Sequence, residues 1–149
     1  MATKKSQKKE KIDPKKYAEI LRRVKLGEIY LDSCSVIHKR ENLIKQKDLQ
    51  VLIRDRASYE QSNGKIKVIH KYYLKTKKTE KEKDVALEIS ATFCLIYFSD
   101  THFSEEFFEI FKNTNLVINS WPYLREFVQN ITQRMNIPPL TLPLFRRVA

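Results

Sequence analysis

The sequence predicts an α+β domain in which a four-stranded antiparallel sheet is backed by C-terminal helices. Four segments between residues 28 and 98 alternate apolar and polar residues, which is the pattern of half-exposed strands. From residue 104 onward the apolar residues recur at helical spacing instead. Because the strands precede these helices rather than alternate with them, an α+β fold is favoured over a parallel α/β fold.

The composition is that of one basic globular domain. The chain has 149 residues, 42% of them hydrophobic, and a formal net charge of +11. Seven lysines fall within residues 4–16, and we expect residues 1–12 to form a disordered, lysine-rich tail before a domain spanning residues 13–149. A second lysine-rich stretch, residues 75–84, is expected to be an exposed loop. A basic chain suits nucleic acid, an anionic membrane surface or an acidic protein segment, and nucleic acid is the less favoured partner here.

An additional helix is predicted ahead of the sheet. Asp13 is a good N-cap, and Pro14 suits the first helical position because no N–H is needed there. Apolar residues then recur at helical spacing, namely Tyr17, Ile20, Leu21 and Val24. Gly27 is expected to end this helix as its C-cap.

The first two strands are predicted over residues 28–38 and 49–59. In the first strand, Ile29, Leu31 and Ile37 are expected on one face. The second strand has an apolar face of Leu49, Val51, Ile53 and Ala57 and an opposite face that includes Gln50, Arg54 and Arg56.

A tight hairpin and a largely apolar last strand follow. Asn63-Gly64 predicts the hairpin, since a type I′ turn needs positive φ at both central positions. The next strand alternates lysines with an apolar set, Ile66, Val68 and Tyr72. The last strand covers residues 85–98, and its end, from Cys94 to Phe98, is apolar on both faces. Such a strand needs cover on both sides, from a second subunit or from its own chain.

Two helices are predicted after the sheet. Ser104 can cap a short helix that has two glutamates in its first turn, where the helix dipole favours negative charge. A longer helix is predicted from about Ser120 to Met135, and the Pro138-Pro139 pair prevents its continuation. Its apolar stripe consists of Trp121, Leu124, Val128, Ile131 and Met135, widened by Phe127.

No local pattern predicts catalysis. The chain has two glycines, too few for a phosphate-binding loop or a dinucleotide fingerprint. The histidines are far apart in sequence, and we expect His38 and His70 at the surface or rim of the sheet. Cys34 and Cys94 belong to no metal-binding cluster, although a cross-strand disulfide between them stays open. We therefore expect a protein that is not an enzyme and has no metal or cofactor. A catalytic triad could assemble from residues distant in sequence, but no nucleophile-elbow motif supports one.

No segment predicts membrane insertion or secretion. No apolar run approaches the ~20 residues needed to cross a bilayer, and the N-terminus is lysine-rich without an apolar stretch behind it. We expect a cytoplasmic protein with reduced thiols and no transmembrane segment.

The last third of the chain contains a two-part motif. The first part is a Pro-Tyr-x-Arg-Glu core formed by Pro122, Tyr123, Arg125 and Glu126. The second part is an apolar-Pro-x-Leu-x-Leu stretch formed by Ile137, Pro138, Leu140 and Leu142. Together they resemble the main helix and the following extended segment of the SecB-like protein-export chaperones. The predicted strands also follow that family's order, so the resemblance extends over residues 27–145.

The resemblance implies a SecB-like fold, a homotetramer built as a dimer of dimers, and an ATP-independent holdase. Such a protein binds apolar segments of unfolded or nascent polypeptides. Its further partners would be SecA, for protein export, or an antitoxin as a dedicated client. A holdase needs no catalytic group, but it does need apolar side chains that a client can reach.

The client-binding groove is expected to combine the crossover after the first strand, the main helix and the C-terminal segment. Its candidate residues are Leu43, Ile44, Trp121, Tyr123, Phe127, Leu140, Leu142, Leu144 and Phe145. Packing in the core is the alternative for each of them.

The chain departs from the exporting members of that family, whose acidic sheet residues meet SecA. Its corresponding polar positions include Arg54, Arg56, Lys67 and Lys71. The basic charge of these positions makes delivery to SecA less favoured, whereas the holdase function does not depend on acidic sheet residues. Two alternatives remain: a basic nucleic-acid-binding adaptor, whose affinity would fall steeply with salt, and an interaction protein without chaperone action.

Overall fold

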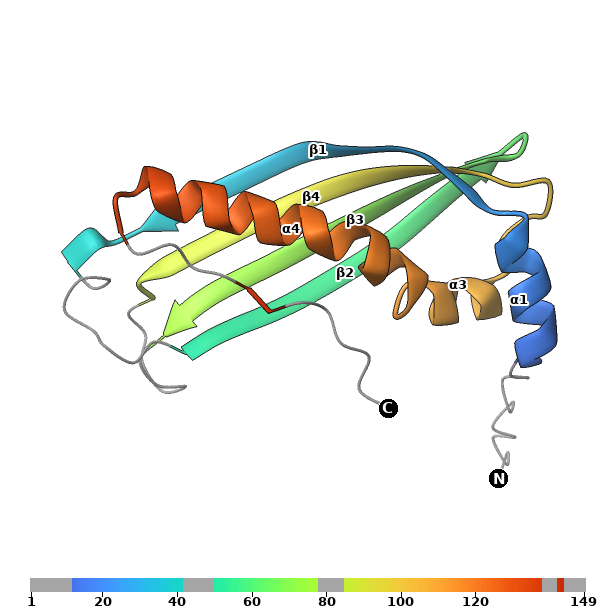
Figure 1. Ribbon diagram of the computed structural model, residues 1–149, viewed down its shortest axis with the longest axis horizontal. Helices are drawn as coiled ribbons and strands as arrows, with labels where there is room; N and C mark the ends of the chain where they lie inside the picture. The colour runs from blue at the N-terminus through green and yellow to red at the C-terminus, as the bar shows by residue number, and fades with distance from the viewer. Residues whose placement is uncertain (1–11, 42–49, 78–84, 138–141, 144–149) are drawn as a thin grey trace, which may run out of the picture.

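One antiparallel sheet and three helices make up the described part of the chain. The computed structural model describes residues 12–41, 50–77, 85–137 and 142–143. The strands β1 (Lys25–His38), β2 (Gln50–Ser62), β3 (Lys65–Lys77) and β4 (Leu87–Phe98) form a sheet in the order β1-β4-β3-β2 (Figure 1). The helices are α1 (Pro14–Arg22), α3 (Glu105–Phe111) and α4 (Asn115–Arg134). The predicted α+β fold with a four-stranded antiparallel sheet is confirmed.

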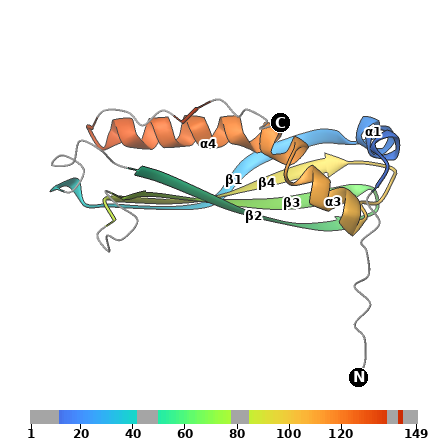
Figure 2. The same cartoon turned by 90° about the horizontal axis from the view of Figure 1, so that it is seen from below.

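The two faces of the sheet have different environments. Figure 2 shows α3 and α4 lying over one face, and no described helix covers the other. We call these the helix-side face and the open face. Directly paired residues on neighbouring strands share a face, so the pairing register assigns each strand residue to one of them.

Helix α1 begins as predicted and ends earlier. Asp13 caps it, because its Oδ1 accepts a hydrogen bond from the Lys15 N–H at 3.2 Å. The helix ends at Arg22, so the prediction that Gly27 is its C-cap is wrong. Gly27 lies in β1 instead, where a side chain would collide with the ring of Phe98 on β4.

β1 is an edge strand whose pairing with β4 has two register shifts, the second between Leu31 and Ser33. Before that shift Leu31 lies on the helix-side face. After it Val36 lies on that face, and Ile37, paired with Glu88, lies on the open face. The prediction that Ile37 shares a face with Leu31 is therefore wrong, because the extra residue at the bulge inverts the alternation.

The hairpin between β2 and β3 confirms its prediction. Asn63 and Gly64 both have positive φ, 49° and 79°. The two strands pair without a register shift along their whole length. The predicted apolar set of β3, Ile66, Val68 and Tyr72, is at most 2% exposed.

β4 is buried along its helix-side face and only in part on its open face. Its helix-side residues Ile89, Ala91, Phe93, Leu95 and Tyr97 belong to the core. On the open face Cys94 and Ile96 are also buried, 1% and 6% exposed, whereas Phe98 is 49% exposed. Cys34 pairs with Ala91 on the opposite face from Cys94, and both thiols are free. The disulfide left open by the sequence is therefore not formed.

α3 closes one end of the core. Its predicted cap is confirmed, because the Phe107 N–H donates to Ser104 Oγ at 3.1 Å. The buried aromatic rings of this helix are Phe107, Phe108 and Phe111. Tyr17 of α1 lies 4.9 Å from the Phe107 ring between centroids and donates a 2.7 Å hydrogen bond to Asn115. These contacts hold the N-terminal helix against α3 and the start of α4.

α4 is longer than predicted. It begins at Asn115, so the predicted start near Ser120 is wrong. Leu116 is fully buried, and it extends the buried stripe by one turn toward the N-terminus. Pro122 consequently lies inside the helix, where it lacks the N–H of a regular helical hydrogen bond. The buried stripe consists of Leu116, Ser120, Leu124, Val128 and Thr132, while Trp121, Ile131 and Met135 are half-buried.

Replacing Gly64 by alanine should destabilise the hairpin. The φ of 79° is unfavourable for a residue with a Cβ, and the new atom would lie 3.2 Å from the Ser99 carbonyl oxygen. We expect Gly64→Ala to lower the free energy of unfolding by about 1–2 kcal/mol, measured by urea denaturation. Asn63→Gly is the control and should change it by less than about 0.5 kcal/mol. Equal stabilities for Gly64→Ala and the wild type would contradict this account of the turn.

Candidate functional site

A buried polar network joins α4 to the sheet. His70 Nδ1 on β3 is 2.9 Å from Ser120 Oγ on α4, and His70 Nε2 is 2.8 Å from Asp55 Oδ2 on β2. The Tyr72 hydroxyl lies 2.7 Å from the same Ser120 oxygen. His70 is 0% exposed, so the expectation that it is a surface or rim residue is wrong. It is in phase with Val68 and Tyr72 on β3, and that phase places it on the helix-side face.

One set of hydrogen-bond directions satisfies every member of this network. The hydrogen bond with His70 lowers the pKa of the Asp55 carboxyl, and burial raises the pKa of the Tyr72 phenol. Asp55 is therefore an acceptor at neutral pH, and Tyr72 retains its proton. With His70 neutral, Tyr72 O–H donates to Ser120, Ser120 O–H donates to His70 Nδ1, and His70 Nε2–H donates to Asp55.

Asp55, His70 and Ser120 are the residue types of a hydrolase triad, but the burial of His70 and Ser120 assigns them another role. Ser120 is 0% exposed and also binds Tyr72. A nucleophilic serine has to meet its substrate, and this hydroxyl lies between the helix and the sheet. A fully satisfied buried network fixes the position of the elements that contribute to it. We therefore assign the network to holding α4 on the sheet.

One flank of α4 is covered by the chain's own C-terminal segment. Trp121 Nε1 donates to the Pro143 carbonyl at 2.8 Å, and Arg125 Nε donates to the Leu142 carbonyl at 2.9 Å. Leu142 is 3% exposed and belongs to the core. The Trp121 ring also lies 6.0 Å from the Tyr72 ring of β3 between centroids. Residues 142–143 therefore lie against α4 on its β3 side.

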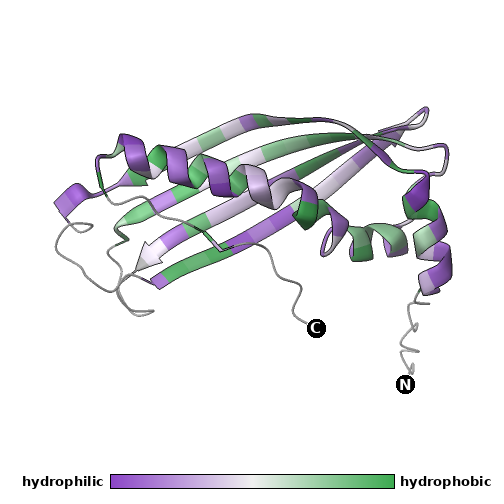
Figure 3. Ribbon diagram, in the orientation of Figure 1, coloured by the Kyte–Doolittle hydropathy of each residue, from purple (hydrophilic) through white to green (hydrophobic). Residues whose placement is uncertain are grey.

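The other flank of α4 leaves apolar side chains exposed. Tyr123 is 47% exposed, and its ring lies 6.4 Å from that of Phe93 on β4 between centroids. Leu31 of β1 pairs with Phe93 and is 41% exposed. Leu26, also on the helix-side face of β1, is 41% exposed. Figure 3 shows apolar segments along β1 and α4 interrupted by polar ones.

We call this surface the α4–β1 strip and define it by Leu26, Ile29, Leu31, Tyr123 and Phe127. Ile29 and Phe127 are half-buried against the core, and the other members are exposed. The strip follows the edge strand of the sheet. It is rigid on both sides, since β1 pairs with β4 and α4 is fixed by the His70 network.

The structure separates the predicted groove residues. Tyr123 and Phe127 lie on the α4–β1 strip, whereas Trp121 and Leu142 lie on the opposite flank of α4. Leu142 is in the core of its own chain, and Trp121 is half-buried. The remaining predicted members, Leu43, Ile44, Leu140, Leu144 and Phe145, lie outside the described residues.

Sequence reasoning missed Leu26 and placed Leu31 only on one face of a predicted strand, without a binding role. The alternation of apolar residues gave the correct face for Leu31. It did not show that β1 is an edge strand, and that position is what leaves both leucines exposed. No signal within the first strand itself could have predicted this, because strand order depends on the pairing of distant segments.

Neither a metal-binding cluster nor a membrane-spanning helix is present among the described residues. Within residues 12–41, 50–77, 85–137 and 142–143, no group of three or more His, Cys, Asp or Glu side chains is placed to hold a metal ion. None of the described helices has the length and apolarity needed to span a bilayer.

Comparison with known proteins rests on structure. No family model matches the chain, and no curated protein matches it by sequence. Among solved structures it is similar to the SecB-like chaperone Rv1957 of Mycobacterium tuberculosis in complex with a ChAD peptide from the Rv1956 HigA1 antitoxin. The TM-score is 0.72 at 17% identity, covering 90% of this chain and 99% of that one. The chain has a SecB-like fold. This confirms the fold implied by the C-terminal motif.

A weaker likeness is to a protein of unknown function from Streptococcus agalactiae. The TM-score is 0.42 at 10% identity, covering 81% of this chain and 97% of that one.

Removing the Asp55 charge should change how stability depends on pH. The folded-state pKa of Asp55 lies below the ordinary value of 3.8. Its carboxylate therefore stabilises the fold above that value, and this stabilisation is lost as the pH falls through the folded-state pKa. We expect the stability difference between wild type and Asp55→Asn to be constant above about pH 5 and to shrink at lower pH. Urea denaturation over roughly pH 2.5 to 7 measures it.

Asp100→Asn provides the matched control, because it removes one exposed carboxylate that forms no ion pair within the described residues. If both variants differ from the wild type by the same amount at every pH, the Asp55–His70 hydrogen bond has no part in the acid response.

Proposed function

We propose that this chain is an ATP-independent cytoplasmic chaperone, a holdase that binds apolar segments of non-native polypeptides on the α4–β1 strip. The single observation that supports this most is the exposure of Leu26, Leu31 and Tyr123, at 41%, 41% and 47%, on rigid elements. Ordinary surface leucines occur singly, whereas these lie along one edge of the fold.

The physical basis is non-directional apolar burial. A client side chain that covers these residues gains about 25 cal/mol for each Å² of apolar surface removed from water. Such binding demands little sequence specificity and no chemical step. The backbone edge of β1 before its second bulge, at residues 26–31, can add hydrogen bonds to an extended client, since β4 is the only neighbour of β1 among the described strands.

The proposed client surface extends beyond the strip. Sequence reasoning adds Trp121 of α4, together with the crossover after β1 and the C-terminal segment, whose candidates are Leu43, Ile44, Leu140, Leu142, Leu144 and Phe145. Leu142 would reach a client only if residues 142–143 leave α4, because its side chain is buried in this arrangement. The α4–β1 strip needs no such movement.

A dedicated client is favoured over general export. The structurally similar chaperone Rv1957 is bound to a peptide from an antitoxin, which supports an antitoxin as the client here. The open face of the sheet, in contrast, is basic at Arg54, Arg56 and Lys71. Exporting family members are expected to meet SecA through acidic residues on the sheet. The positive charge of this face therefore does not favour delivery to SecA.

We also propose a homo-oligomer, built as a dimer of dimers. β1 is an exposed edge with Ile37 59% and Tyr30 37% exposed on its open face. After its second bulge, residues 33–38 pair regularly with β4. Pairing of this stretch with a second copy would extend the sheet and remove an apolar edge from solvent.

Disruption of the α4–β1 strip should reduce chaperone activity without unfolding the protein. We expect the variant that combines Leu31→Ser with Tyr123→Ser to suppress client aggregation less well. The protein concentration required for suppression should rise by about tenfold. Light scattering of a chemically unfolded model client, diluted in the absence of nucleotide, measures the effect. Circular dichroism checks that the variant is folded.

Ile118→Ser is the matched control, because Ile118 is 54% exposed on the same helix but does not belong to the strip. It should suppress aggregation as well as the wild type. A wild-type protein that leaves aggregation unchanged at stoichiometric concentration would overturn the proposal of a general holdase.

The edge-pairing proposal predicts that Ile37→Lys reduces the oligomer. A lysine on an edge strand opposes strand addition and keeps its charge in solvent. Multi-angle light scattering should give a smaller mass for Ile37→Lys than for the wild type, while Ile118→Lys leaves the mass unchanged. A wild-type protein that is monomeric at micromolar concentration would rule the oligomer out.

A further inference from the structure

We propose that the open face of the sheet contains a second binding site, for an extended acidic segment of a partner protein. This site lies on the opposite side of the sheet from the α4–β1 strip, and it does not depend on the chaperone function proposed above.

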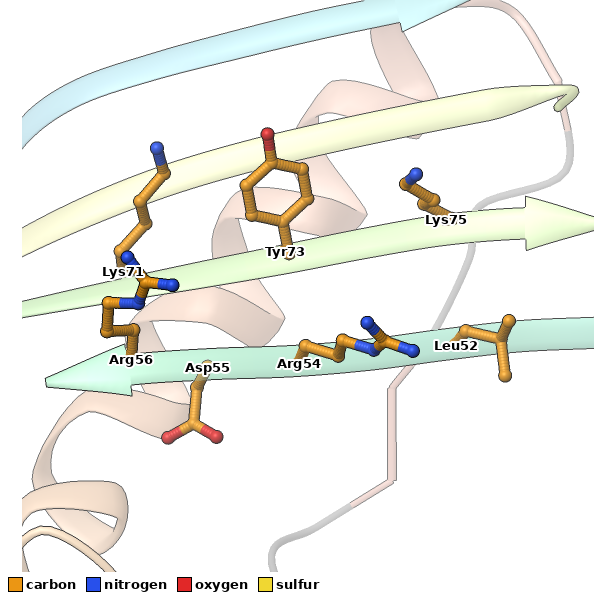
Figure 4. Close-up of a pocket in the computed structure, with 7 residues that line it drawn as sticks. All are labelled: Leu52, Arg54, Asp55, Arg56, Lys71, Tyr73 and Lys75. Atoms are coloured by element: carbon orange, nitrogen blue, oxygen red, sulfur yellow. The ribbon is translucent and has the colours of Figure 1, made fainter.

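The site is a cleft of about 620 Å³ on the β2 half of the open face (Figure 4). Its lining includes Leu52, Arg54, Arg56, Lys71, Tyr73 and Lys75. All six side chains lie on the open face, because they form directly paired positions of β2 and β3: Leu52 with Lys75, Arg54 with Tyr73, and Arg56 with Lys71. Figure 4 shows them on the side of the sheet away from α4.

The positive charge of this cleft is mostly unbalanced. Lys75 is 3.7 Å from Glu88 of β4. Asp55, at the edge of the cleft, is engaged with His70. Among the described residues, Arg54, Arg56 and Lys71 form no ion pair. Three neighbouring cations therefore have no carboxylate partner within the described part of the chain, which favours an anionic ligand.

The arrangement of the arginines matches an extended chain. Arg54 and Arg56 are two residues apart on one strand, roughly 6.6 Å along it, which is the repeat of alternate side chains in a facing strand. β2 is an edge strand with β3 as its only neighbour among the described strands, and it pairs without a bulge. A partner strand added along β2 would place every second side chain beside the arginines, where cross-strand opposite charges are favourable.

A polypeptide fits this cleft better than single-stranded nucleic acid. Nucleic acid of that kind is bound by aromatic faces on which successive bases stack. Among the described residues that line the cleft, Tyr73 alone is aromatic, and the Lys71 ammonium already lies 5.3 Å from the centroid of its ring. A sheet edge also offers backbone groups that pair with peptides and not with nucleotides. The geometry therefore points to glutamate or aspartate at alternate positions of a partner segment.

The test measures binding of the full chain to a labelled nine-residue peptide with glutamate at alternate positions, by fluorescence anisotropy. Arg54→Glu combined with Arg56→Glu should weaken binding by about tenfold. Arg22→Glu combined with Arg23→Glu in and after α1 is the matched control, since both arginines are exposed and the change in net charge is equal. The control should weaken binding less than twofold.

Two further ligands in the same binding assay test which chemistry the cleft recognises. The same peptide with glutamine in place of glutamate should not bind, and an oligothymidine of equal charge should bind no more tightly than the acidic peptide.

Equal losses in the two arginine variants would show that only net charge matters, and this would overturn the proposal. An oligothymidine that binds more tightly, and that loses affinity only in the Arg54/Arg56 variant, would replace it with a nucleic-acid site. If the glutamate variant is unfolded, Arg54→Gln combined with Arg56→Gln repeats the comparison, with Arg22→Gln combined with Arg23→Gln as its charge-matched control.

Discussion

The attachment of α4 to the sheet is the constraint on which the rest of the structure depends. A four-stranded sheet needs cover on at least one face, and α4 contributes to it through Leu116, Leu124 and Val128. Apolar packing alone permits sliding along a stripe. The hydrogen bond from Ser120 to His70 fixes the helix at one position, because a shift would leave buried polar atoms unsatisfied.

The position of α4 also determines what remains exposed. The helix is narrower than the sheet, so each of its flanks faces a different strand. On the β3 side, Trp121 and Arg125 bind the returning C-terminal segment. On the β1 side no described segment covers Leu31 and Tyr123. One side of α4 is thus covered by the C-terminal segment and the other side is exposed. We propose that clients bind on the exposed side.

The two faces of the sheet suit different partners because strand alternation separates their chemistry. On β3, Val68, His70 and Tyr72 face the helix, while Lys71 and Tyr73 face solvent. One face therefore contains the apolar core with its flanking strip, and the other contains a cationic cleft beside a regular edge strand. A client and an acidic partner could be bound at once without competing for the same residues.

Local sequence patterns were enough to predict the order of the elements, the Asp13 and Ser104 caps, the Asn63-Gly64 turn and, through the C-terminal motif, the SecB-like fold. These features depend on backbone conformations and periodicities that are set by residues close in the chain. Only the tertiary structure decided that a bulge turns Ile37 to the open face and that His70 meets Ser120, fifty residues away in sequence. The strand order, seen only in the tertiary structure, places β1 with Leu26 and Leu31 at the edge of the sheet. Strand order, register and helix position arise from pairing between distant segments, whose partners no local pattern specifies.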